Sequence, residues 1–244
     1  TAAGSLAADL IPARRNGTGL GYFAMSTNLA VVFGPFIGLV IIQYASYNVL
    51  FIVLSVFILA GGLLALTIPV KENDTSPVQG SRFKFSFNDL FEKKALPLAA
   101  IACLVAFSYA SILSFLSIYA EEQNLLSVAS YFYAVFAVAM IATRPFTGKI
   151  YDTFGAKYVI IPSFVLFGIG LVILANAQQA IPFLLSAIFI GIGYGTLTTS
   201  FQSLCVQSTS PMRSGYATAT YFTLFDLGIA IGSYVFGVVA VASG

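Results

Sequence analysis

The sequence predicts an all-α membrane protein, a polytopic helical bundle, and three observations support this prediction. Hydrophobic residues make up 59% of the 244-residue chain and charged residues only 8%, against about a quarter in soluble domains. Charge-free runs long enough to cross a bilayer follow one another along the chain. All eleven lysines and arginines fall in the segments between these runs. We therefore expect lipid to surround most of the chain.

Helices rather than strands are expected to cross the membrane. A helix needs about 20 apolar residues to span a hydrocarbon core of roughly 30 Å, and only helices or closed barrels satisfy the backbone there. Membrane strands alternate apolar and polar residues over about ten positions, whereas the runs here are longer and continuous. We predict seven full transmembrane helices plus a stub.

The first half of the chain contains the stub and two crossings. Residues 1–8 read as the end of one span, followed by a charged loop at 9–15. Residues 16–70 carry no charge and, at 55 residues, can cross twice. We expect these two crossings to turn at the polar and aromatic segment 43–48. Because the chain opens with Thr1 inside an apolar segment and shows no signal peptide, we expect it to be an internal piece of a longer protein.

The second half contains five further predicted crossings. These are residues 95–120, residues 123–143, a pair within 158–212 that turns around 176–179, and residues 214–241. With alternating crossings, every loop that carries lysine or arginine lies on one side, and the opposite loops carry only Glu121 and Glu122. Positive residues favour the cytoplasmic side. We therefore predict a multi-pass protein of the cell (plasma) membrane with its charged loops in the cytoplasm.

Residues 71–94 form the longest predicted loop, with five cations and four acids. Phenylalanines alternate with arginine and lysine over residues 82–94, which is typical of a segment lying on the inner membrane surface. A plain linker with a short amphipathic helix is the alternative.

Enzyme chemistry is not expected. The chain has no histidine, which excludes a histidine-based metal site or proton relay. Cys103 and Cys205 both lie in apolar runs and are interpreted as small buried residues rather than a disulfide framework. We predict no catalytic residue, no metal, no cofactor and no nucleic-acid partner. A seven-span receptor is a weaker interpretation of this chain. No lysine lies mid-span to bind retinal, and a receptor would not explain the charged segment at residues 144–157.

The segment Arg144–Lys157, RPFTGKIYDTFGAK, lies between two long apolar runs and is predicted to be a tight turn at the membrane surface. Its glycines, Gly148 and Gly155, would allow tight helix ends and close approach. Asp152 could face the positive N-terminus of a neighbouring helix, with Arg144 and Lys157 as partner charges. Such a cluster would hold the inner face shut and separate when that face opens. A helix cap with membrane-surface charges and no gating role is the alternative.

The spacing Gly148-x-x-x-Asp152-x-x-Gly155-x-Lys157 resembles the loop motif of the major facilitator superfamily. The resemblance implies twelve spans in two six-span bundles, with this chain running from the end of span four through span eleven. Residues 1–70 would then end the N-terminal bundle, 71–94 would be the cytoplasmic inter-bundle linker, and 95–244 would be the C-terminal bundle without its last span.

A second motif, Gly34-Pro35-Phe36-Ile37-Gly38, is similar to the antiporter motif of the drug–proton exporter branch, although Ala30 and Leu39 stand where that pattern has glycine. Pro35 would kink its helix, and Gly34 and Gly38 would let a neighbouring helix pack closely. A packing kink in any transporter is the alternative.

Asp226 is the acid placed well inside a predicted span. It lies eleven residues beyond Gly215, which is about 16 Å along a helix and near the bilayer midplane. Intramembrane acids usually face a cavity or a partner, so Asp226 is a proton-coupling candidate, on one face with Ala219, Thr223, Ala230 and Ser233. A permanently protonated Asp226 bonded to a neighbouring Tyr or Thr is the alternative.

A weak internal repeat pairs Arg15-Asn16-Gly17 with Arg213-Ser214-Gly215 and Asn28 with Asp226, as parallel transporter repeats would. Gly191-x-Gly193-x-Gly195 lies mid-span without a preceding strand, so it is read as helix packing rather than a nucleotide loop. The further candidates for a cavity lining share polar side chains inside spans: Asn28, Ser108, Tyr109, Ser111, Ser114, Tyr194, Thr198, Gln202 and Thr223.

The resemblance implies a secondary active transporter that works by alternating access. Proton-coupled efflux of a small molecule or drug, as in multidrug resistance, is the leading expectation. An uptake symporter or uniporter for a sugar or other nutrient is the alternative. The expected partners are a small-molecule substrate, protons and the lipid bilayer.

Overall fold

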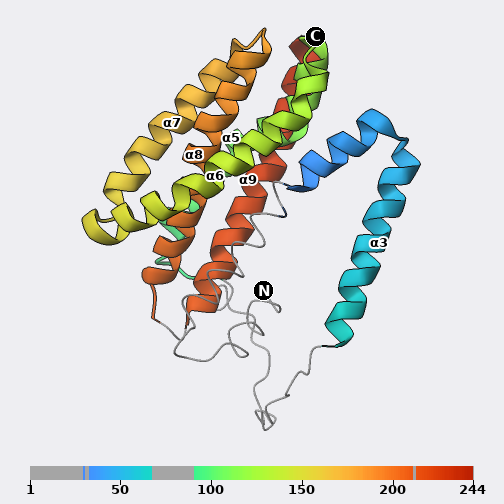
Figure 1. The fold of residues 1–244 in the computed structure, drawn as a ribbon. Coiled ribbons are helices and arrows are strands. Elements are labelled where there is room, and N and C mark those ends of the chain that lie inside the picture. Colours follow the sequence, from blue (N-terminus) through green and yellow to red (C-terminus); the bar gives the residue numbers. More distant parts are fainter. Residues whose placement is uncertain (1–29, 31–32, 68–90, 211–212, 244) are drawn as a thin grey trace. The chain divides into compact units, whose positions relative to one another are not determined.

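The computed structural model describes residues 30, 33–67, 91–210 and 213–243, which are helical with short connections and without a strand. It divides into two compact units, residues 1–84 and 85–244, and each is described by itself. Six described helices are long and apolar enough to cross a membrane (Figure 1). The predicted all-α polytopic bundle is confirmed. The predicted stub, residues 16–29 and the 71–90 part of the charged loop lie outside the described residues.

The first unit contains a short apolar helix, Phe33–Tyr44, followed by α3, Tyr47–Leu66. The chain turns between them at Ala45 and Ser46, within the predicted turn at 43–48. The Ser46 carbonyl accepts the N–H groups of Val49 and Leu50 and so begins α3. No residue of α3 is buried, which is consistent with a helix that lipid or other helices cover.

The second unit contains five helices in alternating directions. They are α5 (Leu96–Glu122), α6 (Leu126–Phe154), α7 (Lys157–Ala175), α8 (Ala180–Gln207) and α9 (Ser214–Ser243). Helix α8 is central and contacts the other four, while α5 packs most extensively against α9. The N-terminal ends of α5, α7 and α9 lie at the same end as the C-terminal ends of α6 and α8 (Figure 1). The described cations of this unit belong to that half of the bundle, as the alternation of spans predicts.

Glycines let α8 lie directly against two neighbours, α6 and α7. A Cβ atom at Gly191 would lie 2.5 Å from the Phe136 carbonyl oxygen of α6, and one at Gly193 would lie 2.6 Å from the Phe167 nitrogen of α7. At Gly195 it would collide with the Met140 side chain of α6. These contacts confirm that the Gly191-x-Gly193-x-Gly195 sequence serves helix packing.

Helix α9 approaches α5 in the same way. A Cβ atom at Gly228 would collide with the Cys103 carbonyl oxygen, and one at Gly232 would lie 2.6 Å from the Phe107 carbonyl oxygen. Glycines four residues apart therefore hold this pair backbone against backbone, a packing mode common between membrane helices.

The segment from Arg144 onward differs from the prediction. Helix α6 continues to Phe154, so the connection to α7 consists only of Gly155 and Ala156. The charged side chains of Lys149 and Asp152 are exposed and do not interrupt the helix. Gly155 ends it with φ 94° and ψ 166°, a conformation that is nearly exclusive to glycine.

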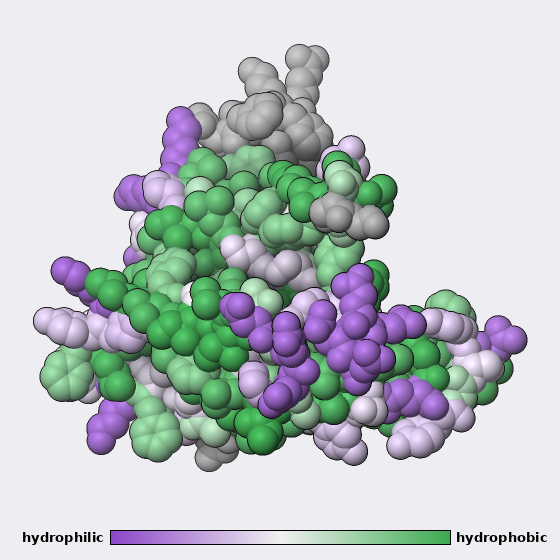
Figure 2. Space-filling model, turned by 90° about the horizontal axis from the view of Figure 1, so that it is seen from above, coloured by the Kyte–Doolittle hydropathy of each residue, from purple (hydrophilic) through white to green (hydrophobic). Residues whose placement is uncertain are grey.

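The outer surfaces of the helices are apolar. Figure 2 shows hydrophobic residues over much of the visible face, with clusters of hydrophilic residues between them. Large exposed side chains such as Leu104, Val138 and Val172 point away from the five-helix core. Such a surface requires a lipid-like environment.

Candidate functional site

Tyr194 of α8 lies where the five helices of the second unit meet. Its ring contacts one ring from each of the other helices. These rings are Tyr109 of α5, Phe136 of α6, Phe167 of α7 and Phe225 of α9, at centroid distances of 3.9, 5.9, 6.1 and 6.5 Å. We call these five side chains the aromatic hub. Periodicity along one helix gave no signal for it, because the hub depends on which helices pair.

Tyr109 is almost fully enclosed within the aromatic hub. It is 1% exposed and stacks on Tyr194 with 20° between the ring planes. Phe136 lies 6.0 Å from it. The structure thus brings together two predicted cavity residues, Tyr109 and Tyr194, but it places them in a closed core. The Tyr109 hydroxyl has no hydrogen-bond partner within the described part of the chain.

Tyr221 connects the aromatic hub to α9. Its ring stacks on Phe225 at 5.6 Å, and its hydroxyl donates a 2.9 Å hydrogen bond to the Thr198 carbonyl of α8. Tyr221 was not among the residues predicted for the site. Tyr221 lies on the same span as Asp226, four residues before Phe225 and five before Asp226. This short separation could have identified Tyr221 as a site residue.

Asp226 lies beside the aromatic hub but on the outer side of α9. Its side chain is exposed in the second unit, as are Thr223 and Ala230, whereas Gly228 faces α5. The carboxylate lies within electrostatic reach of the Tyr194 and Tyr221 hydroxyls. No described residue gives it a hydrogen bond or an ion pair. Ser233 was predicted to lie on the same face of α9 as Asp226. Its side chain instead points toward α5, where its hydroxyl shares a 2.8 Å hydrogen bond with Ser114.

The remaining cavity candidates are placed less favourably for binding. The hydroxyls of Ser108, Ser111 and Thr198 donate to carbonyls of their own helices at 3.1, 2.7 and 3.2 Å. Gln202 is half-buried on α8. Asn28 lies outside the described residues.

The residues of the charged motif are spread along the end of α6 and the start of α7. Arg144 lies ten residues before the end of α6, about 15 Å along the helix. Its Nη2 atom is buried without a partner among the described residues, as is the Tyr151 hydroxyl. Asp152 and Lys157 are exposed, and no ion pair joins Asp152 to Arg144 or Lys157 in the described structure. Gly148 has open space around it.

The antiporter-like residues Gly34, Pro35 and Gly38 lie in the short helix Phe33–Tyr44 of the first unit. Among the described residues, no atom approaches the position of a Cβ at Gly34 or Gly38. The close packing of a neighbouring helix against these glycines stays a prediction. A kink at Pro35 would change the helix at residues 31 and 32, and these two residues lie outside the described part of the chain.

An ion pair that the sequence analysis did not select lies at the ends of α5 and α9. The Arg213 Nε donates to Glu92 Oε2 at 2.5 Å, and the guanidinium lies 4.9 Å from the Tyr216 ring centroid. The hydrogen bond from Arg213 holds the pKa of Glu92 below its ordinary value. The Glu92 carbonyl accepts the N–H groups of Ala95 and Leu96 and so begins α5. The pair could have been predicted from the sequence, because an acid and an arginine stand at the starts of two spans that run in the same direction.

A second polar network supports this ion pair. The Glu92 N–H donates to Thr220 Oγ1 at 2.9 Å, and that hydroxyl donates to the Tyr216 carbonyl at 2.8 Å. The Cys205 thiol of α8 donates to the Ala95 carbonyl at 3.7 Å. Thus α5, α8 and α9 are tied together at this end.

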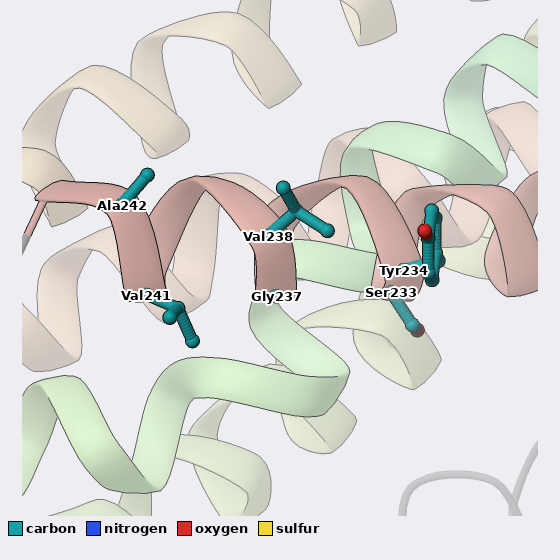
Figure 3. A pocket seen from close by; sticks show the side chains of 6 residues that line it. All are labelled: Ser233, Tyr234, Gly237, Val238, Val241 and Ala242. Carbon is teal, nitrogen blue, oxygen red and sulfur yellow. The ribbon is translucent and has the colours of Figure 1, made fainter.

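A shallow open groove runs along the last turns of α9. It is lined by Ser233, Tyr234, Gly237, Val238, Val241 and Ala242 (Figure 3). These side chains come from a single helix and carry no charge. Within the described residues there is also no cluster of three or more metal-ligating side chains.

Comparison with known proteins gives a family match over nearly the whole chain. Residues 1–233 match the Major Facilitator Superfamily. An uncharacterized MFS-type transporter of Methanocaldococcus jannaschii is 26% identical over 244 residues, covering 98% of this chain and 63% of that protein. The riboflavin transporter RibZ of Clostridioides difficile is 27% identical over 163 residues, covering 64% of this chain and 36% of that protein. The chain thus spans less than two thirds of the length of either relative. No solved structure gives a significant match.

Proposed function

The chain belongs to the major facilitator superfamily, and from this we propose that the protein is a secondary active transporter that exports a small molecule or drug in exchange for protons. Both relatives named above are described as transporters. Alternating access would be carried out by two bundles, of which residues 1–70 belong to the first and 95–244 to the second. Residues 71–94 would link them on the cytoplasmic side.

The observation that carries the proposal is the position of Asp226. A carboxylate inside a membrane span is costly unless it meets water, a partner or protein. Because no described residue of its own bundle pairs with Asp226, its face of α9 is better suited to a water-filled cavity than to lipid. Thr223 and Ala230 on that face are small enough to leave such a cavity open.

Proton coupling would follow from that position. Asp226 would take up a proton when the cavity opens to one side and release it when the cavity opens to the other. The neighbouring Tyr194 and Tyr221 would respond to the change of charge, because both lie within its electrostatic reach. The motif residues Arg144, Gly148, Asp152, Gly155 and Lys157 would contribute to closing the inner side.

A nutrient carrier is the second candidate, and one observation favours it. The relative RibZ is described as a riboflavin transporter. A flat aromatic substrate would stack on Phe225, the half-buried ring that precedes Asp226 on α9. In that case the protein would be an uptake symporter or uniporter on the same fold.

The test uses the full-length protein in inside-out vesicles with an imposed proton gradient. Lipophilic cations, sugars and riboflavin are added in turn, and proton release is compared between wild type and Asp226→Asn. We expect substrate-dependent proton release that the variant loses. Glu121→Gln, at the opposite end of the bundle from the charged motif, is the matched control and should behave as wild type.

The outcomes separate the candidates. Proton movement that is unchanged in Asp226→Asn would reject the coupling role. Riboflavin or sugar movement without proton release would favour the nutrient carrier over the exporter. Proton release that is lost in Glu121→Gln as well would mean that the assay reports expression rather than coupling.

A further inference from the structure

The Tyr109 hydroxyl differs from the hydroxyls of two other buried tyrosines of the second unit, Tyr133 and Tyr221. Tyr133 donates to the Ile112 carbonyl at 3.4 Å, and Tyr221 donates to the Thr198 carbonyl at 2.9 Å. Tyr109 is 1% exposed and has no partner among the described residues. Its surroundings on two sides are the rings of Tyr194 and Phe136.

An arrangement of this kind is costly. A buried polar group without a hydrogen bond loses its hydration and gains nothing in exchange. Such groups are few in native structures, and each one calls for an explanation. A phenylalanine at position 109 would fill the same space without that cost, so packing alone does not explain the tyrosine.

The surroundings of Tyr109 suggest where its partner lies. Tyr194, at 3.9 Å between ring centroids, also makes no hydrogen bond to a described residue. The two rings belong to α5 and α8, which touch less extensively than α5 and α9 or α8 and α6. A small slide between α5 and α8 would move one stacked ring across the other and could bring the two hydroxyls together.

Resting on the transport function proposed above, we propose that the Tyr109 hydroxyl bonds to the Tyr194 hydroxyl in a second conformation of the transport cycle. Tyr109 is then a positioning residue that opposes the conformation described here and favours the other. Asp226 lies within electrostatic reach of Tyr194, so its protonation would act on the same pair. The charge on the outer face of α9 would thereby influence the contact between α5 and α8.

The first measurement is the thermal stability of full-length Tyr109→Phe and Tyr221→Phe in detergent. Tyr109→Phe removes the unpaired hydroxyl and should raise Tm, because this conformation is relieved of a cost. Tyr221→Phe is the matched control, since it removes a hydroxyl that forms a 2.9 Å bond, and it should lower Tm. A Tyr109→Phe variant whose Tm falls like that of the control would overturn the proposal, because its hydroxyl would then be bonded in this conformation.

The second measurement reports conformation without requiring transport. Cys205 is fully buried on α8 and donates to the carbonyl of Ala95, the residue before α5, so a slide between α5 and α8 would expose it. In a Cys103→Ala background, N-ethylmaleimide should alkylate Cys205 about tenfold more slowly in Tyr109→Phe than in Tyr109, the factor expected for one lost hydrogen bond. An unchanged rate would overturn the proposal.

The third measurement tests the partner and the link to transport. Tyr109→Phe should lower the maximal transport rate while leaving KM nearly unchanged, because the hydroxyl does not touch substrate. In a Tyr194→Phe background, Tyr109→Phe should have no further effect on Cys205 alkylation, and additive effects would overturn the Tyr194 pairing. If wild type moves none of the compounds tested, the transport proposal fails, while the alkylation rates still decide the conformational one.

Discussion

The Glu92 carboxylate and the Arg213 guanidinium form an ion pair between residues 121 positions apart, at the N-terminal ends of α5 and α9. Glu92 lies just before α5 and Arg213 just before α9. The Glu92 N–H also donates a hydrogen bond to the Thr220 hydroxyl of α9. The glycine contacts at Gly228 and Gly232 continue the same pairing along the helices. The backbone contacts and the ion pair therefore both join α5 to α9.

The stability that this ion pair provides should depend on pH. The pKa of Glu92 is lowered in the folded protein, so its contribution is present above the unfolded value of about 4.3 and is lost as the pH falls through the lower folded value. Glu92→Gln should therefore have a lower Tm than wild type at pH 7, and the two should converge only once the pH has fallen below the lowered folded-state pKa of Glu92. Thermal unfolding across pH measures this. Glu122→Gln, an exposed carboxylate, should show no such convergence.

The two glycines of the charged motif should respond oppositely to alanine. Gly155→Ala forces a side chain into the conformation at φ 94° and ψ 166°, which should cost about 1–3 kcal/mol. Gly148→Ala lies in a helix with open space around it and should gain up to about 1 kcal/mol from helix propensity. Free energies of unfolding in a denaturing detergent series would measure both. Equal destabilisation by the two substitutions would contradict the helix boundary at Gly155.

Helix α8 should be intolerant of side chains at its packed glycines. Gly191→Leu would drive a side chain into the Phe136 carbonyl of α6, and overpacking of this kind costs about 1–3 kcal/mol or more. Gly168→Leu on α7, where no atom lies within 4 Å, is the matched control and should fold normally. Folded yield by size-exclusion chromatography and Tm measure the difference. Normal folding of Gly191→Leu would mean that α6 and α8 are not in backbone contact.

Asp152 should affect the rate of transport rather than the stability of the fold. It is exposed near the end of α6 and forms no ion pair within the described residues, so Asp152→Asn should leave Tm unchanged. If the motif acts as an inner gate, the variant should slow turnover. Transport in vesicles and Tm, measured on the same preparation, separate these effects. A variant with wild-type turnover would reduce the motif to a helix end.

The spans could be predicted because charge marks their ends. The starts of α5 and α9 follow from where charge-free runs begin, and the turn at residues 176–179 follows from its uncharged polar side chains inside such a run. The end of α6 could not be placed this way, since lysine and aspartate continue a helix that extends beyond the apolar run, and only Gly155 ends it.

The candidate site could be predicted only residue by residue. Tyr109, Tyr194 and Asp226 were selected because polar side chains are uncommon inside spans. That Tyr109 stacks on Tyr194 while Asp226 lies on an outer face depends on the pairing of helices, which a single sequence does not state. The Glu92–Arg213 ion pair was not predicted for the same reason, because each residue, taken alone, resembles an ordinary charged residue of a loop.

The glycine contacts divide the second unit into two blocks. Helix α8 touches the backbones of α6 and α7 through Gly191 and Gly193, and α9 touches the backbone of α5 through Gly228 and Gly232. Between the blocks, aromatic rings such as Tyr109 and Tyr194 supply much of the contact, together with the polar ties near Ala95 and Thr198. Rings stacked face to face resist separation but offer little resistance to sliding. We therefore expect any relative movement within the second unit to occur at this layer of rings, where the three-helix block and the two-helix block can shift while each keeps its own backbone contacts.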